Sequence, residues 1–507
     1  MLKQIRNKRV DHHHSHSYRR YAPLKKGVNM THVDEENACA SIKRSRPKLL
    51  CFLTFCSLLS CYLLLISSFF SFPTSTFPHV NPYEGEDETL IDLKVPACSS
   101  VLNGTICCDR RSPRSDICIM NGDIRTNSSS FSVFLYTYDH VSNDLNTRKQ
   151  EKIKPYTRKW EPSTMATIDE LTLISKNTNA STIENRHKCD VNHNVPAVFF
   201  STGGFTGNVY HEFNDGLIPL YITSQKYNKK VVFVILEYHK WWVTKYGDVV
   251  SQLSAYEPID FNRENRTHCF SEAIVGLRIH DELAINYTLM ENSKTIQDFH
   301  DVLDKSFWPR IQSLNQEEPM ETIDPKKPKL VIISRHGSRT VTNQKLLVKM
   351  AKRIGFSVQV LWPNRKTELP LIYRSLNSSD VMIGVHGAAM THFLFMKPRS
   401  VFIQVIPLGT KWAAETYYGG PAKKLGLRYI GYEILPQESS LYNEYDHNDV
   451  VLINPDNVNG RGWQFTKNIY LDRQKVKINL TRFRKHLVHS HLYVMAKNNQ
   501  GQTRAWA

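Results

Sequence analysis

The sequence predicts an α/β fold organised around parallel β-sheet, and three observations support this prediction. Residues 330–333 form a short apolar run rich in β-branched side chains, as is typical of a strand buried on both faces. Helical and strand patterns then alternate, with a helix over 343–354, a strand over 356–362, a helix over 369–376 and a strand over 381–385. With 507 residues, the chain is also long enough for two domains.

Cations and a His-Gly turn follow the first and third strands of this unit. Arg335 and Arg339 come directly after the first strand, and His386, Gly387 and Ala388 come directly after the third. Because ligands bind beyond the carboxyl ends of parallel strands, we expect these residues to converge. Guanidinium groups and the N–H groups of a helix start suit a pyrophosphate. No Asp-x-Asp triplet occurs beyond residue 72, so we expect a nucleoside diphosphate to leave without the help of a metal.

A second candidate site lies in the first half of the chain, after a strand predicted over 196–201. The loop that follows this strand contains Gly203, Gly204, Gly207 and Asn208. Glycines between a strand and a helix let the backbone approach a ligand closely. We therefore include these four residues among the candidate substrate-binding residues.

The helix predicted over 209–221 places an imidazole and a carboxylate on the same face, because His211 and Asp215 are four residues apart. Glu212 is their neighbour. A carboxylate beside a histidine at a glycine-rich helix start suits general-base catalysis. The alternative, that His211 and Asp215 only cap and support a turn, stays open.

Composition divides the chain into a tail, an anchor, a stem and a larger body. The first 48 residues contain twelve Lys or Arg against four Asp or Glu, which predicts a disordered tail. Residues 49–72 have no charged residue and can span a bilayer, and the basic residues before them place the tail in the cytosol. The predicted segments are the cytosolic tail 1–48, the transmembrane signal anchor 49–72, the stem 73–97, an N-terminal lobe 98–320, a C-terminal lobe 321–490 and a terminal tail 491–507.

The formal net charge of +17 raises the question of a nucleic-acid partner. Twelve basic and four acidic residues give the tail +8 of this charge, and the remaining Lys and Arg are spread along the chain. We therefore expect no nucleic-acid partner. The His-rich tract at 12–16 is interpreted as a solvated part of the tail rather than a metal site.

The residues beyond the anchor have the features of a lumenal protein. Six of the ten cysteines lie there, at positions 98, 107, 108, 118, 189 and 269, and disulfides are expected although six cysteines allow 15 pairings. A zinc site is disfavoured because these cysteines lack paired C-x₂-C elements. Seven Asn-x-Ser/Thr triplets provide candidate glycosylation sites at Asn103, Asn127, Asn179, Asn265, Asn286, Asn377 and Asn479.

The remaining elements are predicted from periodicity. Strands are expected over 130–138, 231–236, 273–279, 400–406 and 427–434, and helices over 239–253, 296–314 and 481–494. Residues 147–185 look irregular, and residues 315–329, which are rich in Pro, Lys and acidic side chains, are predicted to be a domain boundary. Trp241 and Trp242 are expected in the core rather than in a sugar platform.

One short motif favours a different chemistry. Arg335-His336-Gly337 resembles the nucleophile motif of histidine phosphatases, in which His336 would attack a phosphoryl group. That motif normally opens the catalytic domain, whereas here a long lumenal segment precedes it. We therefore keep a phosphohydrolase as the alternative.

Several longer motifs, in a fixed order, resemble those of plant members of glycosyltransferase family 61. They are the segments 107–126, 201–215 (STGGFTGNVYHEFND), 333–339 (ISRHGSR), 383–392 (IGVHGAAMTH) and 460–463 (GRGW). The resemblance covers residues 98 to 487. It implies a type II membrane protein of the Golgi apparatus with a GT-B-like architecture, in which two Rossmann-type domains face each other across a cleft. It also implies inverting, metal-independent transfer of arabinofuranose or xylose from a UDP-sugar to xylan.

The resemblance also assigns roles to the two lobes. Asp215 becomes the candidate base on the acceptor side, with His211 and Glu212 as neighbours or alternates. Arg335, Arg339, His386 and Gly387 would bind the donor, and Glu438, Ser439 and Ser440 would reach its nucleoside. Residues 389–392 (AMTH) stand where a Gly-Leu-Thr-Asn-like run is common in the family, which is a departure from its pattern at the expected nucleotide site. The sequence does not separate an arabinosyl from a xylosyl donor, and a lumenal glycan-binding protein without turnover is the non-enzymatic alternative.

Overall fold

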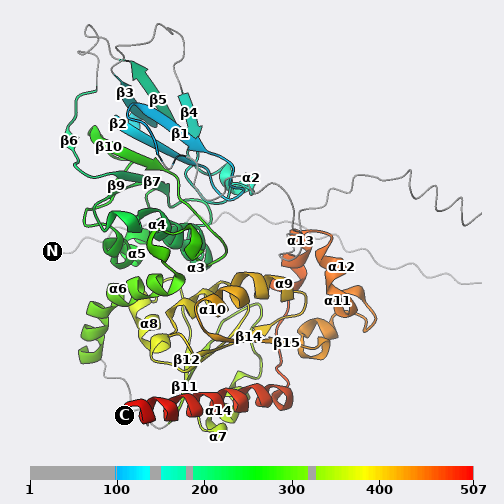
Figure 1. The fold of residues 1–507 in the computed structure, drawn as a ribbon. Coiled ribbons are helices and arrows are strands. Elements are labelled where there is room, and N and C mark those ends of the chain that lie inside the picture. Colours follow the sequence, from blue (N-terminus) through cyan, green and yellow to red (C-terminus); the bar gives the residue numbers. More distant parts are fainter. Residues whose placement is uncertain (1–97, 99, 138–149, 178–186, 318–326, 506–507) are drawn as a thin grey trace, which may run out of the picture. The chain divides into compact units, whose positions relative to one another are not determined.

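The computed structural model describes residues 98, 100–137, 150–177, 187–317 and 327–505 (Figure 1). The predicted tail 1–48, the predicted anchor 49–72 and the predicted stem 73–97 lie outside these residues, as does the triplet at Asn179. Among the residues described, no helix combines the length and the apolar character needed to cross a bilayer.

The first half of the chain forms a mixed sheet of ten strands in the order β4-β5-β3-β2-β10-β7-β8-β9, in which β1 also pairs with β2 and β6 with β10. Strands β7, β8 and β9 are parallel, and β10 runs parallel to β7. Strands β1, β2 and β10 pair antiparallel, so this lobe is not a purely parallel sheet. The strands are β1 (Thr105–Asp109), β2 (Ile117–Asn127), β3 (Ser132–Thr137), β4 (Gln150–Ile153), β5 (Leu171–Asn177), β6 (Val191–Asn192), β7 (Ala197–Ser201), β8 (Val232–Leu236), β9 (Ile259–Asp260) and β10 (His268–Val275).

The prediction that residues 147–185 are irregular is wrong. They contain β4, the short helix α2 (Pro162–Met165) and β5. Leu171 and Leu173 are fully buried, whereas Thr172 and Ile174 are only partly buried, which is the period-two burial of a strand with one buried face. Thr172 and Ile174 therefore belong to the second face of a strand.

The second half of the chain forms a five-stranded parallel sheet in the order β12-β11-β13-β14-β15. All four strand pairs are parallel, as predicted from the alternation of helices and strands. The order reverses between β11 and β13, which makes the carboxyl ends of these two strands the topological switch point. The strands are β11 (Lys329–Ile333), β12 (Ser357–Leu361), β13 (Val381–Val385), β14 (Val401–Ile406) and β15 (Arg428–Glu433).

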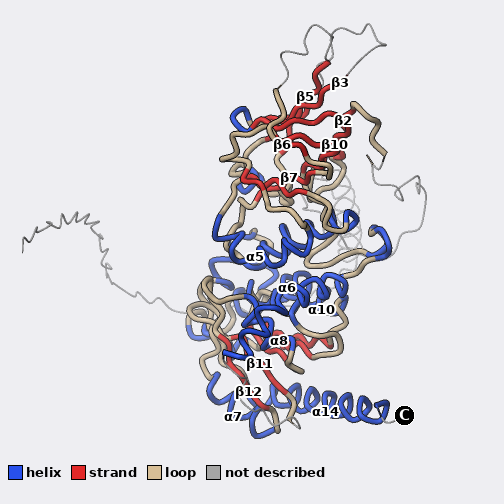
Figure 2. Tube along the Cα trace, turned by 90° about the vertical axis from the view of Figure 1, so that its left-hand side faces the viewer, coloured by secondary structure: helices blue, strands red, loops and turns tan. Residues whose placement is uncertain are grey.

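Helices occupy the space between the two sheets. The two views agree that α5, α6, α8 and α10 lie between the sheets, while α7 and α14 cover the opposite face of the second sheet (Figure 1, Figure 2). The main helices are α4 (Ile218–Ser224), α5 (Lys240–Leu253), α6 (Ile296–Glu317), α7 (Gln344–Ile354), α8 (Leu369–Asn377) and α14 (Leu480–Ala505). Shorter ones are α3 (Val209–His211), α9 (Lys411–Ala414), α10 (Gly420–Lys424), α11 (Val450–Ile453), α12 (Pro455–Asn459) and α13 (Trp463–Thr466).

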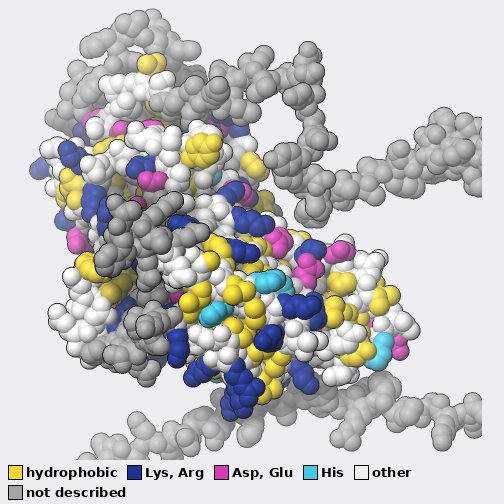
Figure 3. Space-filling view, turned by 60° about the horizontal axis from the view of Figure 1, so that its bottom comes forward, with side chains coloured by type: hydrophobic (Ala, Val, Ile, Leu, Met, Phe, Trp, Pro, Cys, Tyr) yellow, Lys and Arg dark blue, Asp and Glu magenta, His cyan; other side chains and the backbone are white. Residues whose placement is uncertain are grey.

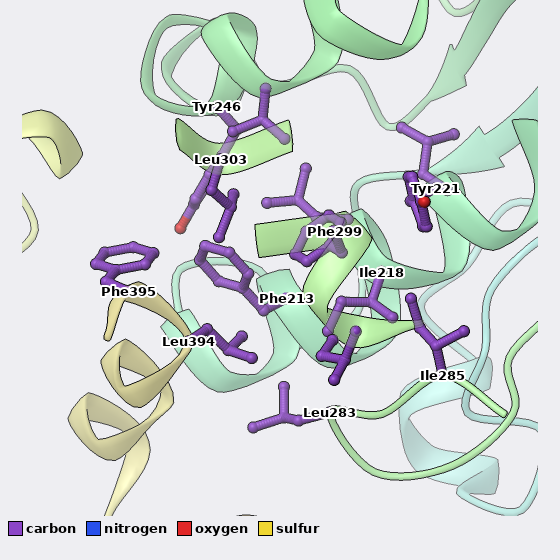
Figure 4. Packing of buried hydrophobic residues seen from close by; sticks show 14 of the residues in the cluster. Phe213, Ile218, Tyr221, Tyr246, Leu283, Ile285, Phe299, Leu303, Leu394 and Phe395 are labelled. Carbon is purple, nitrogen blue, oxygen red and sulfur yellow. The ribbon is translucent and has the colours of Figure 1, made fainter. Parts of the chain in front are cut away.

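One buried hydrophobic cluster includes side chains from both sheets and from the helices between them. Phe213 lies inside it and is fully buried, with its ring 5.8 Å from that of Phe395 and 6.5 Å from that of Phe299 (Figure 4). Trp242 belongs to the same cluster, as expected, whereas Trp241 is 43% exposed. Residues 90–507 form one compact unit. The expected arrangement of two domains across a cleft therefore stays a prediction.

All six cysteines beyond the predicted anchor form disulfides: Cys98–Cys107, Cys108–Cys118 and Cys189–Cys269. Cys108 and Cys118 are direct partners in the register of β1 and β2. This confirms the prediction of disulfides and supplies the pairing that the sequence left open.

Lys and Arg side chains are interspersed with hydrophobic ones on the face shown in Figure 3, which brings the lower end of Figure 1 forward. Acidic side chains lie among them on the same face. The charge is mixed there rather than concentrated in one band.

Candidate active site

The glycine-rich loop joins the end of β7 to helix α3. Gly204 has a φ of +62° and lies against the ring of Tyr156, so that a Cβ there would be 2.5 Å from a ring carbon. Gly207 also has a positive φ, of +88°. Asn208 begins the helix, since its side-chain oxygen accepts the backbone N–H of Tyr210 at 3.1 Å. The loop conformation therefore requires glycine at two of the predicted positions.

The helix predicted over 209–221 is interrupted by a π-helical turn, Glu212–Leu217, between α3 and α4. π-Turns inside α-helices are frequent at functional sites. The turn still leaves His211 and Asp215 side by side, as their spacing predicted, with His211 Nδ1 2.6 Å from Asp215 Oδ2. Phe213, between them in the sequence, is fully buried in the hydrophobic cluster and anchors the turn to the core.

Asp215 is almost completely enclosed by protein groups. Its Oδ2 accepts the Nε–H of Arg158 at 2.9 Å, and its Oδ1 accepts an N–H from Asn214 at 2.7 Å. Thr157 donates its hydroxyl to the backbone oxygen of Asp215 at 2.8 Å. The Asp215 side chain is 1% exposed, whereas that of His211 is 15% exposed. The accessible member of the pair is therefore the imidazole.

The short contact between His211 and Asp215 also locates a proton. His211 Nδ1 is 3.2 Å from an N–H of Arg158, but it is much closer to the carboxylate. A nitrogen 2.6 Å from a carboxylate oxygen donates to it, because two lone pairs would repel at this distance. Nδ1 is therefore protonated, and Nε2 of neutral His211 is free to accept a proton.

Arg158 is the functional residue that the sequence did not reveal. It follows β4 in the stretch predicted to be irregular, and it is 5% exposed. Its guanidinium binds Asp215, and it also binds Glu161 at 2.9 Å. The contact with Asp215 joins residues 57 positions apart, so no local sequence pattern could predict it.

Glu212 faces the glycine-rich loop and helix α5. It accepts the N–H of Gly207 at 2.5 Å and the indole N–H of Trp242 at 2.6 Å. Burial raises the pKa of Glu212 to about 7. A small cavity is lined by His211, Glu212, Trp242 and Tyr156, among other residues. Glu212 thus ties the loop to α5, next to the pair formed by His211 and Asp215.

The predicted cations converge at the switch point of the second sheet. Arg335 and Arg339 both donate to the backbone oxygen of His386, at 3.3 and 3.0 Å. Both side chains are aimed at the first turn after β13, although they follow β11 in the sequence. The convergence expected from the strand order is therefore confirmed.

The two guanidinium groups lie together without an ion-pair partner in the described part of the chain, and Asp472, which pairs with Lys467, attracts Arg339 only from beyond ion-pair distance. Among the described residues, no carboxylate forms an ion pair with Arg335 or Arg339. Both Nε–H groups are buried and have no hydrogen-bond partner there. Burial lowers the pKa of Arg335, and burial together with Arg335 lowers the pKa of Arg339 to about 10. The positive charge of these two arginines is therefore not balanced by any neighbouring carboxylate that the structure describes.

His386 is buried beside the two arginines and is neutral. Burial and the two cations lower its pKa to about 3. Its Nδ1 contacts the side-chain nitrogen of Gln404 at 3.0 Å, and the oxygen of Gln404 accepts the hydroxyl of Tyr429 at 2.9 Å. Since the amide nitrogen of Gln404 can only donate, Nδ1 accepts and the proton of His386 lies on Nε2.

Gly387 lets the arginines approach the backbone. Its φ is +146°, and a Cβ there would be 2.7 Å from Arg335 Nη1 and 3.1 Å from Arg339 Nη1. Gly387 precedes a 3₁₀-helix, Ala388–Phe395, whose last residue packs on Phe213. The helix that begins with Ala388 beside the cations therefore ends against the turn that presents His211 and Asp215.

A buried tyrosine connects the two groups of residues more directly. The ring of Tyr418 is 5.5 Å from that of His386 and 5.9 Å from that of Tyr210. The ring of Tyr210 is 5.0 Å from that of His211. The base candidate and the cation pair therefore belong to one neighbourhood.

Other predicted residues are engaged elsewhere. Glu438 is buried and accepts hydrogen bonds from Tyr432, Arg482 and two backbone N–H groups. Ser439 donates to Gln474, and the hydroxyl of Ser440 accepts the N–H of Lys475. Their contact with a nucleoside stays a prediction. His336 is exposed and stacks on Trp362 at 4.6 Å.

The glycosylation and metal predictions are only partly addressed by the geometry. Asn103, Asn265, Asn286 and Asn479 are exposed. The side-chain nitrogen of Asn377 instead donates to Asp304 at 3.2 Å, and Asn127 is half-buried. No three His, Cys, Asp or Glu side chains gather as metal ligands within the described part of the chain. Occupancy of the triplets and independence of metal stay predictions.

Comparison with known proteins points to one family. A model of the glycosyltransferase 61 family matches residues 210–403, which include His211, Asp215, Arg335, Arg339 and His386. The chain is 56% identical to xylan glycosyltransferase MUCI21 of Arabidopsis thaliana, over 88% of this chain and 92% of that protein. It is 34% identical to alpha-1,3-arabinosyltransferase XAT3 of Oryza sativa subsp. japonica, over 81% and 69%. It is also 34% identical to beta-1,2-xylosyltransferase XYXT1 of the same plant, over 74% and 82%.

Proposed function

Because this chain belongs to glycosyltransferase family 61, we propose that it transfers a pentose, either arabinofuranose or xylose, from a UDP-sugar to side-chain positions of xylan. Similarity to proteins named as xylan, arabinosyl and xylosyl transferases supports this choice of substrate class. The family match also favours glycosyl transfer over the phosphohydrolase suggested by Arg335-His336-Gly337.

The observation that carries the proposal is that the two neighbouring arginines at the ends of β11 and β13 have no carboxylate partner among the described residues. Two half-buried guanidinium groups, whose buried Nε–H groups have no partner, share the His386 carbonyl and have no anion beside them in the part of the chain that the structure describes. The diphosphate of a nucleotide sugar supplies two negative groups of the geometry that guanidinium binds. As the sugar bond breaks, negative charge grows on the leaving diphosphate, and Arg335 and Arg339 stabilise it.

Neutral His386 and the start of the 3₁₀-helix add donors to the same anion site. With Nδ1 accepting from Gln404, His386 presents its Nε2–H as a donor. The backbone N–H groups at the start of the helix that opens with Ala388 favour negative charge. Binding then depends on groups whose charge does not change near neutral pH.

The acceptor hydroxyl loses its proton to the other group of residues. An inverting transfer needs one base, which removes the proton as the hydroxyl oxygen attacks the sugar carbon from the face opposite the leaving group. We assign that base to Nε2 of His211, because Asp215 is enclosed and already accepts from Arg158 and His211. Asp215 then orients the imidazole and stabilises the imidazolium that forms. This modifies the assignment of Asp215 as the base.

The topology of the protein is part of the proposal. A Golgi membrane protein with one anchor at 49–72, a lumenal catalytic part and two lobes facing each other agrees with the lumenal features of residues 98–505. Disulfides between Cys98 and Cys107, Cys108 and Cys118, and Cys189 and Cys269 support an oxidising compartment. We further propose that transfer needs no metal, which predicts full activity in the presence of a chelator.

Turnover decides between the enzyme and a glycan-binding protein. The purified full-length protein is incubated with labelled UDP-xylose or UDP-arabinofuranose and xylo-oligosaccharides, with and without EDTA. We expect one donor to yield a labelled oligosaccharide of inverted anomeric configuration, at the same rate with EDTA. UDP binding without product from either donor would contradict the proposed transfer.

A further inference from the structure

Two exposed indoles next to the candidate active site have no role in the chemistry described so far. Trp412 on α9 is 42% exposed, and Trp463, the first residue of α13, is 54% exposed. Their rings meet edge to face with centroids 6.3 Å apart. Two large apolar rings from segments fifty positions apart thus form one exposed aromatic pair.

The loops that present these indoles are fixed to each other. Asn459 donates its side-chain N–H to the backbone oxygen of Gly409 at 3.0 Å, and it accepts the hydroxyl of Thr466 at 2.7 Å. Gly462, just before Trp463, has a φ of +110°, which favours glycine. The GRGW motif therefore sets the position of an exposed side chain on a rigid support.

The aromatic pair is continuous with the candidate active site. Trp412 contacts Tyr417 at 5.8 Å, Tyr417 contacts Tyr210 at 5.4 Å, and Tyr210 adjoins His211. Helix α9 follows the carboxyl end of β14, the same edge of the sheet that presents Arg335 and His386. A molecule that lies on the two indoles would therefore extend away from His211 and Arg335 along the carboxyl edge of the second sheet.

We propose that Trp412 and Trp463 form a subsite that binds the xylan chain at sugar residues beyond the one that reacts. This rests on the proposed function. The two C–H faces of a pyranose ring pack on an indole, and a pentose ring has no hydroxymethyl arm to prevent this. The neighbouring Lys411 is paired with Glu433 at 2.9 Å, so its charge is compensated beside the two flat apolar rings that a neutral chain would contact.

The test compares acceptor lengths in the full-length protein. Trp463→Ala and Trp412→Ala are expected to raise the KM for xylohexaose by about five-fold, the size of one lost aromatic contact. Their KM for xylotriose and for the UDP-sugar should stay within two-fold of the wild type. Trp463→Phe, which keeps a flat ring, should recover part of the loss. Trp308→Ala is the matched control, because Trp308 on α6 is also 54% exposed.

Each other outcome overturns the subsite. Equal effects on xylotriose and xylohexaose would make the indoles structural, and a changed oligomeric state without a change in KM would assign them to a protein partner. If the wild type transfers to neither acceptor, the proposed function fails instead. The subsite is then tested by electrophoresis in a gel containing xylan, where unchanged retardation of Trp463→Ala would overturn it.

Discussion

The two halves of the candidate site differ in how their charged side chains are paired. Around His211, the cation Arg158 has two carboxylate partners, and the carboxylate of Asp215 accepts from four side chains of the protein. At the ends of β11 and β13, Arg335 and Arg339 share one carbonyl oxygen, and burial together with Arg335 lowers the pKa of Arg339. In the proposed mechanism, the first arrangement orients the base before any substrate binds. The second is then completed by the diphosphate of the donor.

This difference separates the residues that matter for stability from those that matter for donor binding. Removing one partner of a buried ion pair leaves the other charge uncompensated, which is strongly destabilising. Removing one of two neighbouring like charges has no such cost. The same kind of substitution should therefore lower the free energy of unfolding in one half and only weaken binding in the other.

The largest effect is expected at His211. Replacement of the base, His211→Gln, should lower kcat by about 1000-fold, because general-base catalysis is lost. UDP affinity, measured by calorimetry, should stay within two-fold because the arginines are untouched. His336→Gln is a matched control, since His336 is exposed and stacks on Trp362. An active His211→Gln variant would remove this residue from the chemistry.

The next effect concerns Asp215. Asp215→Asn should lower kcat by about 100-fold through loss of imidazole orientation, and should lower the free energy of unfolding by about 3 kcal/mol, because Arg158 stays buried. Urea denaturation measures the second quantity. Glu161→Gln is the control, since Glu161 is the more exposed partner of Arg158 and should cost less than about 1 kcal/mol. A larger kcat loss in Asp215→Asn than in His211→Gln would restore Asp215 as the base.

At Arg339, substitution should weaken donor binding but leave the stability of the protein unchanged or higher. Arg339→Met is expected to weaken UDP binding by about 10- to 100-fold, the value of a charge-assisted hydrogen bond. The melting temperature of the unliganded protein should stay equal or rise, because Met relieves the repulsion with Arg335. Arg473→Met, at an exposed ion pair with Glu444, should leave UDP affinity unchanged. Strong destabilisation by Arg339→Met would mean that the two halves do not differ as described.

The smallest effect is a pH dependence of stability at Glu212. Its pKa is raised from 4.5 to about 7, so the folded protein binds this proton more tightly than the unfolded chain does. The resulting stability is fully present below pH 4.5 and is lost as pH rises through 7. Melting curves from pH 4.5 to 8 should fall more steeply for the wild type than for Glu212→Gln. Parallel curves would show that Glu212 ionises normally, and Glu257→Gln, at an exposed position, is the control.

The sequence predicted the cation half of the site better than the base half. Arg335, Arg339, His386 and Gly387 directly follow two apolar strands, so the rule for parallel sheets was enough to bring them together. The pair of His211 and Asp215 also followed from spacing along a helix. These are local signals, and the structure places the residues accordingly.

What the sequence missed depends on distant contacts. Arg158 reaches Asp215 from a stretch that looked irregular, and Gln404 and Tyr418 meet His386 only because of strand order and helix packing. The enclosure of Asp215 was therefore not foreseen. The partners of Glu438 include Arg482, 44 positions away, which also could not be inferred. Disulfide pairing was left open for the same reason.

Calorimetric titration with UDP and with uridine, on the wild type and on the Arg335→Met/Arg339→Met double variant, tests the central claim most directly. The wild type should bind UDP at least about 100-fold more tightly than uridine, because the arginines bind the diphosphate. That preference should disappear in the double variant while its melting temperature is maintained. A double variant that still prefers UDP by the same factor would contradict the assignment of the two arginines as the diphosphate site.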